Sequence, residues 1–256
     1  MTAIDEELFN VGIPRSYLAG MQTTPTVAST SVSIAEGVCM GNDQSTAIRL
    51  TSALVKVLSS SWAVGTGNGG LYAATSIQGN QSYHLFTILR TDTDVVDAYF
   101  DTSVTAANIP SPYTIYRRVA SMKTSTSTNM VDYIQDGDFF QPVTPRLDPT
   151  SATPGTNAVT HTLVAVPSGI NARVLLNITV PTGAFAYVSD LATTDMAPSR
   201  TITPLVTHGG EPGTAQIETQ ITVRTNTSAQ IRTRLSANVA MLMAVTGWFD
   251  TRGRND

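Results

Sequence analysis

The chain has 256 residues, a formal net charge of −4 and a single cysteine, Cys39. One cysteine excludes an intramolecular disulfide and a metal site built from several cysteines. The acidic balance argues against a nucleic-acid surface, which needs a basic patch. The length suffices for one large or two ordinary domains, each with a hydrophobic core.

The composition favours strands. Only 13% of the residues are charged, against roughly a quarter in typical soluble domains. Threonine and valine are abundant instead, and their branched side chains suit a pleated sheet. We therefore predict an all-β fold. A surface so poor in charge must be covered by uncharged polar side chains or by partner chains, as in oligomeric fibre and capsid proteins. The basic residues also favour interfaces, because all but Lys56 and Lys123 are arginines.

The sequence gives no sign of export or of membrane insertion. No N-terminal segment combines a basic start with an apolar core, so no signal peptide is expected. No run approaches the roughly 18 apolar residues that a membrane helix needs. We expect a protein made in a cytoplasm.

Residues 1–20 differ from the rest of the chain. An acidic start, Asp5-Glu6-Glu7, precedes apolar residues, and a proline at position 14 separates two short stretches that could each form a helical turn. This segment either packs on its own domain or attaches the protein to a neighbouring one. In the second case the attachment residues are Leu8, Phe9, Ile13, Tyr17 and Leu18.

Residues 21–145 form the first predicted β domain. Short strands are expected between residues 27 and 58, followed by a glycine-rich turn at residues 62–71. Two apolar segments, 83–90 and 95–100, flank the polar residues 91–94, which predicts a β-hairpin. The glycine spacing differs from that of a dinucleotide-binding or phosphate-binding loop, and no lysine follows it. We therefore interpret the glycines as turn residues.

Residues 146–157 are a predicted proline-rich linker, and residues 158–256 are a predicted C-terminal β-sandwich domain. Prolines at 142, 145, 149 and 154 favour extended backbone with few hydrogen bonds. Beyond them, short strands alternate with turn signals every 8 to 12 residues or so, as in a sandwich or jelly roll.

The first domain resembles virion proteins of tailed bacteriophages over residues 27–122. The resemblance lies in a Trp-Ala-x-Gly-x-Gly-x-Gly-Gly-Leu turn at 62–71 and a Tyr-His-x-Phe-x-Ile-x-Arg strand at 83–90. It continues with Val-Val-Asp-Ala-x-Phe at 95–100 and Tyr-x-x-x-Arg-Arg-Val-x-Ser at 113–121. A further, C-terminal stretch that shares the resemblance is Gly-Trp-Phe-Asp-Thr-Arg-Gly-Arg at 247–254. The resemblance implies a structural protein of the tail-fibre or receptor-binding type and supplies no catalytic residues.

Few residues point to chemistry, and we expect no enzyme, cofactor or metal. The three histidines, His84, His161 and His208, have no metal-binding spacing. Three aspartates around one turn could hold a cation or cleave a glycan, although a solvated turn is the simpler interpretation; they are Asp132, Asp136 and Asp138. Four aromatic residues could stack on a sugar: Trp62, Tyr72, Tyr187 and Trp248. Burial in the core is the alternative for each of them. Tyr187 and Trp248 are the preferred glycan contacts.

The function expected from these observations is a structural component of a tailed-phage particle, a tail-fibre or baseplate protein that takes part in host attachment. Expected partners are two further copies in a homotrimer, other virion proteins, and a glycan or protein of the host surface. The first alternative is a capsid-decoration or head-fibre protein. The second is a glycan-cleaving tailspike enzyme.

Overall fold

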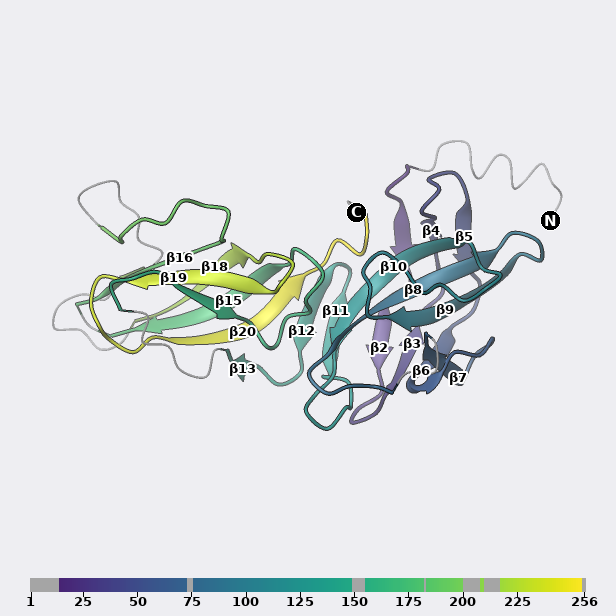
Figure 1. Ribbon diagram of the computed structural model, residues 1–256, viewed down its shortest axis with the longest axis horizontal. Helices are drawn as coiled ribbons and strands as arrows, with labels where there is room; N and C mark the ends of the chain where they lie inside the picture. Colours follow the sequence, from purple (N-terminus) through teal and green to yellow (C-terminus); the bar gives the residue numbers. More distant parts are fainter. Residues whose placement is uncertain are drawn as a thin grey trace. The chain divides into compact units, whose positions relative to one another are not determined.

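The computed structural model describes residues 14–72, 76–148, 155–181, 183–199, 208–209 and 217–254. Within these ranges all regular structure is β strand, arranged in several sheets, and no helix occurs (Figure 1). The predicted all-β class is therefore confirmed. The described ranges accordingly contain no helix with the length and apolarity to span a membrane.

The described part of the predicted N-terminal segment is not helical. Residues 15–16 form a turn, and β1 (Leu18–Gly20) pairs antiparallel with β4 (Gly37–Met40). Gly20 has a φ of +69° and lies so close to β4 that an added Cβ would sit 2.4 Å from the Glu36 carbonyl oxygen. Pairing with a distant strand therefore outweighs the weak local helix preference. Residues 1–13 lie outside the described ranges.

The chain divides into two compact units. Unit 1 comprises Met1–Asp138 and Thr251–Asp256, and unit 2 comprises Phe139–Asp250. This division differs from the predicted linker at 146–157. In the structure β12 (Phe139–Pro142) and β13 (Arg146–Leu147) both pair with β20 (Leu242–Phe249), so the strands of unit 2 begin before the proline-rich stretch.

Unit 1 contains a three-stranded and a seven-stranded sheet. The small sheet has the order β1–β4–β5, with β5 at Ala47–Leu50. The large sheet has the order β10–β8–β9–β7–β6–β3–β2. Its strands are β10 (Ile115–Lys123), β8 (Ser82–Arg90), β9 (Val95–Asp101), β7 (Asn68–Leu71), β6 (Leu54–Ser61), β3 (Ser31–Ile34) and β2 (Thr23–Pro25). The remaining strand, β11, is Tyr133–Asp136.

The core of unit 1 forms around the β8–β9 hairpin. The two strands pair from Arg90↔Val95 to His84↔Asp101, which confirms the predicted hairpin and its polar turn at 91–94. Phe86 and Tyr99 are directly opposite in this register, and their rings stack with centroids 5.5 Å apart. Both are buried, and edge-on packing by Tyr116 extends the cluster towards β10.

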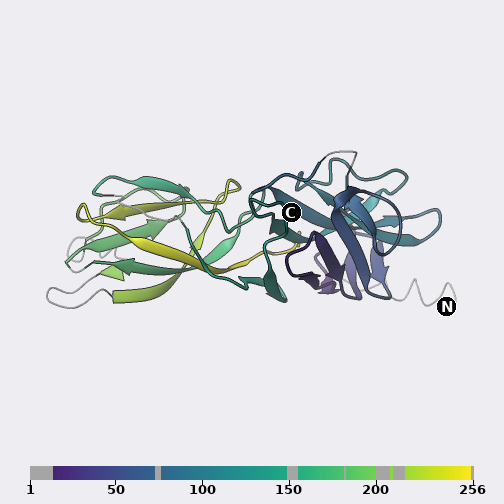
Figure 2. The ribbon, with the colours of Figure 1, turned by 90° about the horizontal axis from the view of Figure 1, so that it is seen from below.

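Unit 2 consists of two sheets whose apolar faces share a core, and Figures 1 and 2 show its strands in two layers. One sheet contains β12, β13 and β20 with β15 (Arg173–Val180) and β18 (Ile217–Arg224). The other has the order β14 (Val159–Thr162), β19 (Gln230–Leu235), β16 (Phe185–Ser189) and β17 (His208–Gly209).

The core of unit 2 follows from alternation along its strands. In β15 every second residue is fully buried, namely Val174, Leu176, Ile178 and Val180. The residues between them face outward, as the period of two requires. Residues 201–206, where the sequence also predicts a strand, lie outside the described residues.

Candidate functional site

The glycine-rich turn encloses a buried ion pair. Lys56 Nζ lies 3.0 Å from Asp97 Oδ1, and both side chains are fully buried. Nζ also donates to the carbonyls of Ala63 (2.7 Å) and Gly65 (3.1 Å), while the Gly65 N–H donates to Asp97 Oδ2 (2.9 Å). Burial lowers the pKa of Lys56, and the neighbouring carboxylate opposes that lowering. A phosphate loop would point N–H groups at its ligand; this turn points carbonyls at a lysine, and its role is structural.

Residues 251–254 follow unit 2 in sequence but belong to unit 1, and Arg252 anchors them there. Its guanidinium is almost fully buried and donates to the carbonyls of Val119 (2.8 Å), Gly20 (3.0 Å) and Met21. The segments 113–121 and 251–254 are therefore in contact within unit 1, although more than a hundred residues separate them in sequence.

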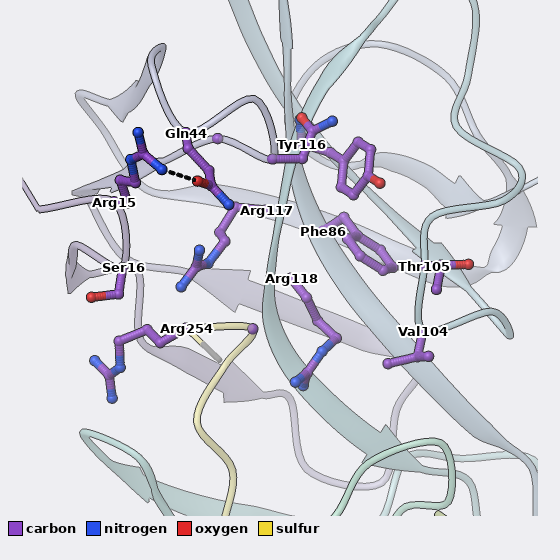
Figure 3. Close-up of a pocket in the computed structure, with 13 residues that line it drawn as sticks. Arg15, Ser16, Gln44, Phe86, Val104, Thr105, Tyr116, Arg117, Arg118 and Arg254 are labelled. Carbon is purple, nitrogen blue, oxygen red and sulfur yellow. Dashed lines mark hydrogen bonds between the residues drawn. The ribbon is translucent and has the colours of Figure 1, made fainter. Parts of the chain in front are cut away.

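A cavity of about 510 Å3 lies in unit 1 beside this anchor. Four arginines line it, Arg15, Arg117, Arg118 and Arg254, and Figure 3 shows their side chains entering from the N-terminal segment, from β10 and from the C-terminal segment. The other lining residues are Ser16, Gly41, Asn42, Gln44, Phe86, Val104, Thr105, Tyr116 and Gly253. No carboxylate side chain belongs to this lining within the described part of the chain.

Arg117 and Arg118 line the same cavity although they are adjacent in a strand. Neighbours in a regular strand point to opposite faces, but the pairing of β10 with β8 shifts register immediately after Arg118, as at a β-bulge. The Arg117 Nε donates to the Arg252 carbonyl at 3.2 Å. The Arg118 NH1 donates to Ser121 Oγ at 2.8 Å, and this oxygen lies 2.9 Å from His84 Nδ1. Both guanidiniums are thus held in fixed positions.

The loop at residues 41–46 forms a rim that is bound to β10. The Asn42 N–H donates to the Tyr116 carbonyl and the Asn42 Oδ1 accepts from the Tyr116 N–H, both at 2.9 Å. Gly41 packs against Ile115 so closely that an added Cβ would lie 2.3 Å from that side chain. At the loop tip Gln44 Oε1 accepts a hydrogen bond from Arg15 NH1 at 3.2 Å (Figure 3).

Each of the four guanidinium groups in the lining already has a partner in the structure. Arg254 forms an ion pair with Asp138, which is not itself a lining residue. Arg15 donates to Gln44, Arg117 to the Arg252 carbonyl and Arg118 to Ser121. Guanidinium groups bind planar oxyanions such as carboxylates and phosphates through paired hydrogen bonds. An oxyanion in this cavity would therefore share these donors with their present partners.

The structure describes only two of the five predicted attachment residues. Tyr17 is half-buried, and its carbonyl accepts the Met40 N–H at 3.0 Å. Leu18 is half-buried in β1 opposite Cys39. Their segment is therefore part of unit 1, while Leu8, Phe9 and Ile13 lie outside the described residues. Contact with another protein stays a prediction for all five.

The predicted glycan contacts both belong to unit 2 and do not line the arginine cavity. Trp248 is only 2% exposed and its ring stacks on Phe140, with centroids 5.6 Å apart, which matches the core alternative given for it. Tyr187 is half-buried in β16 opposite Arg234. A glycan role for Tyr187 stays a prediction.

The remaining candidates are scattered. Asp136 is exposed, Asp138 pairs with Arg254, and the residues that the structure describes hold no group of three or more His, Cys, Asp or Glu able to ligate a metal ion. His84 is buried in unit 1. His161 lies in β14, with its Nε2 2.6 Å from Thr233 Oγ1.

Sequence reasoning missed the four arginines of the cavity. Two signals pointed towards them: the preponderance of arginine over lysine, and the presence of Arg117, Arg118 and Arg254 inside the segments that carry the resemblance. Neither signal indicated that these segments meet. Comparison of the chain with family models, curated proteins and solved structures finds no match.

Proposed function

We propose that this chain is a non-catalytic structural component of a tailed-bacteriophage particle, a tail-fibre or baseplate protein that takes part in host attachment. It is made in the host bacterium, joins the virion through its N-terminal segment and assembles as a homotrimer of β-sandwich or jelly-roll-like domains. The resemblance of residues 27–122 and 247–254 motivates the phage assignment.

The observation that carries the assembly role is the outer face of the β18–β15–β20–β13 sheet. Gln220, Asn177, Ala244 and Leu147 form one row across four strands, and Gln220 Nε2 donates to Asn177 Oδ1 at 3.2 Å. Along this row the face presents amides and small or apolar side chains, and the exposed arginines Arg173 and Arg224 lie at one end of the paired strands. Leu147, 53% exposed, and Leu242, 41% exposed, add apolar surface to it.

Such a face suits contact with another protein surface. Charged residues are depleted in the centres of protein interfaces, and a chain with 13% charged residues has few charges to place elsewhere. Most homo-oligomers have closed rotational symmetry. In such an assembly a neighbouring copy would cover this face on each copy.

The experiment is a deletion of residues 1–13. The structure fixes this end point, because residues 17–20 hydrogen-bond to unit 1 and a longer deletion would remove β1 and the Gly20 carbonyl that Arg252 binds. The truncated protein should remain folded and oligomeric but should no longer join particles when it is supplied in place of the full chain. Incorporation at the full-length level would contradict attachment through this segment.

The location within the particle separates the proposal from its alternative. Gold labelling of the incorporated protein should decorate the tail. Decoration of the capsid would instead identify a head-fibre or decoration protein.

A further inference from the structure

We propose that one end of the outer face of the β18–β15–β20–β12 sheet in unit 2 binds a carboxylate-bearing polysaccharide. The site is a row of side chains across the four strands, in the order Arg224, Arg173, Phe249 and Phe139, which we call the arginine–phenylalanine row. The inference rests on the proposed role in host attachment, and it names the ligand class and the site. Neither of the glycan contacts predicted from the sequence belongs to this row.

Strand pairing fixes the order of the row. Arg173 lies opposite Arg224 on one side and opposite Phe249 on the other, and Phe249 lies opposite Phe139. The residues next to these four in sequence are buried, namely Val223, Val174, Trp248 and Phe140. The row therefore points away from the core. Four strands about 4.8 Å apart give it a length of roughly 14 Å, which exceeds an inorganic ion or a single sugar ring.

The two arginines place like charges directly opposite each other, which destabilises a sheet. Both side chains are exposed, and neither guanidinium donates a hydrogen bond to another residue that the structure describes. Burial raises the pKa of Asp190, whereas hydrogen bonds from Thr193 and the charge of Arg224 lower it below its usual range. Asp190 thus balances part of the Arg224 charge. Local features that lower the stability of the free protein are typical of functional sites, and an anion bound to Arg173 would relieve this repulsion.

The two phenylalanines form an aromatic surface beside the arginines. Phe249 is 41% exposed, and its ring centroid lies 4.9 Å from that of the half-buried Phe139. A Cβ added to Gly247 would lie 2.4 Å from the Phe139 ring, so this ring packs over bare backbone of β20. The face of an aromatic ring is the negative part of its quadrupole. It therefore attracts the weakly positive C–H groups on one side of a sugar ring.

The surroundings of the row favour a saccharide over an acidic peptide. Gln141 and Thr222 are exposed on the same strands, two residues from Phe139 and Arg224. Amides and hydroxyls donate and accept hydrogen bonds, as sugar hydroxyls require. Peptides usually bind at a sheet edge, where backbone groups are free, or in an apolar groove. This row lies across a face whose backbone groups already pair between strands, so a peptide would gain little beyond its charges.

The row is separate from the amide row of the proposed interface. Arg173 and Asn177 are four residues apart in β15, which corresponds to roughly 13 Å along a strand. One end of the face can therefore bind a ligand while the amide row contacts a neighbouring copy.

The test is calorimetric titration of the isolated full-length chain. The probes are tetragalacturonate, a glucuronate-containing tetrasaccharide, the methyl esters of both, tetraglutamate and inorganic phosphate. At least one acidic tetrasaccharide should bind. Its methyl ester, which keeps the rings but lacks the charges, should bind at least about tenfold more weakly. Tetraglutamate, which has carboxylates but no sugar rings, should also bind more weakly. Binding of the acidic sugar should weaken as salt is added.

The variants are Arg173→Gln, Phe249→Ala and the matched control Arg146→Gln. Arg173→Gln should lower the affinity by about tenfold, and Phe249→Ala by roughly three- to tenfold. Arg146 is an exposed arginine of the same sheet outside the row, so its replacement should leave the affinity unchanged. Because Arg173→Gln removes one of two opposed like charges, the melting temperature of unit 2 should stay the same or rise. A purely structural role would predict a fall.

Four results would overturn the proposal: no binding by either acidic tetrasaccharide, equal affinity for its methyl ester, equal affinity for tetraglutamate or inorganic phosphate, or wild-type affinity in Arg173→Gln. Because binding is measured on the isolated chain, it is independent of particle membership. A particle-borne protein that binds no acidic sugar would refute this inference alone. A sugar-binding protein absent from particles would refute the proposed function alone.

Discussion

Removing the Arg252 side chain should destabilise unit 1 selectively. This residue follows unit 2 in sequence, yet its guanidinium donates to three carbonyls of unit 1, on Val119, Gly20 and Met21. A hydrogen bond to a charged group contributes about 1.5–3 kcal/mol, and three would sum to roughly 4.5–9 kcal/mol. Water that enters the vacated space recovers part of that sum. We expect Arg252→Ala to lower the free energy of unfolding of unit 1 by about 3–5 kcal/mol.

The assay is urea unfolding followed by tryptophan fluorescence. The chain has two tryptophans, Trp62 in unit 1 and Trp248 in unit 2. The Trp248→Phe background reports on unit 1, and the Trp62→Phe background reports on unit 2. A loss of 3–5 kcal/mol should move the unit 1 midpoint down by about 1–3 M urea. The free energy of unfolding of unit 2 should change by less than about 0.5 kcal/mol, which is the usual range for a substitution that removes no contact.

Two companion variants sharpen this test. Arg252→Lys keeps the charge, but a single ammonium cannot reach carbonyls on two segments in the way a planar guanidinium does, so it should recover only part of the loss. Arg173→Ala removes an exposed arginine of unit 2 and should leave unit 1 unaffected. An Arg252→Ala protein whose unit 1 midpoint matches the wild type would refute the anchoring of the C-terminal segment.

Three further predictions concern the buried pair, a packing glycine and pH. Lys56→Met leaves Asp97 buried without its cation and should lower the free energy of unfolding by about 3–5 kcal/mol. In a double-mutant cycle, adding Asp97→Asn to Lys56→Met should lower the free energy of unfolding by less than Asp97→Asn does in the wild type. Gly247→Ala places a Cβ 2.4 Å from the Phe139 ring and should cost about 1–3 kcal/mol; a Phe139→Leu background should reduce that cost. Burial lowers the pKa of His161, opposed in part by Asp148, so the unfolded state binds more protons and unit 2 should lose stability as pH falls through 6.5 towards the folded pKa. His161→Gln should flatten that dependence in thermal melts.

Local patterns in the sequence sufficed to predict the central hairpin and the long strands. The segments 83–90 and 95–100 are apolar on both sides of a polar turn, and the structure pairs them as β8 and β9. Within residues 158–256 the sequence predicted short strands between turn signals, and β15 is one of them. In both cases the deciding information lies within a few residues, since hydrophobic period and turn chemistry are local properties.

The elements that sequence reasoning missed depend on distant partners. β1 forms because its backbone pairs with β4, and the boundary after Asp138 exists because β12 pairs with β20 about a hundred residues later. The cavity has the same origin. Arg15, Arg117 and Arg254 come together only when the first and last segments of the chain meet at β10. No local pattern carries that information.

The proposal that this chain is a virion component is tested most directly by quantitative mass spectrometry of purified particles. Under the proposal a phage genome encodes the chain, and the particles of that phage are purified and washed free of host lysate. The account predicts that peptides from both units are present. With the major capsid protein as the internal standard, the copy number per particle should be fixed and a multiple of three. Absence of the protein from washed particles, with abundant protein in the lysate, would contradict it.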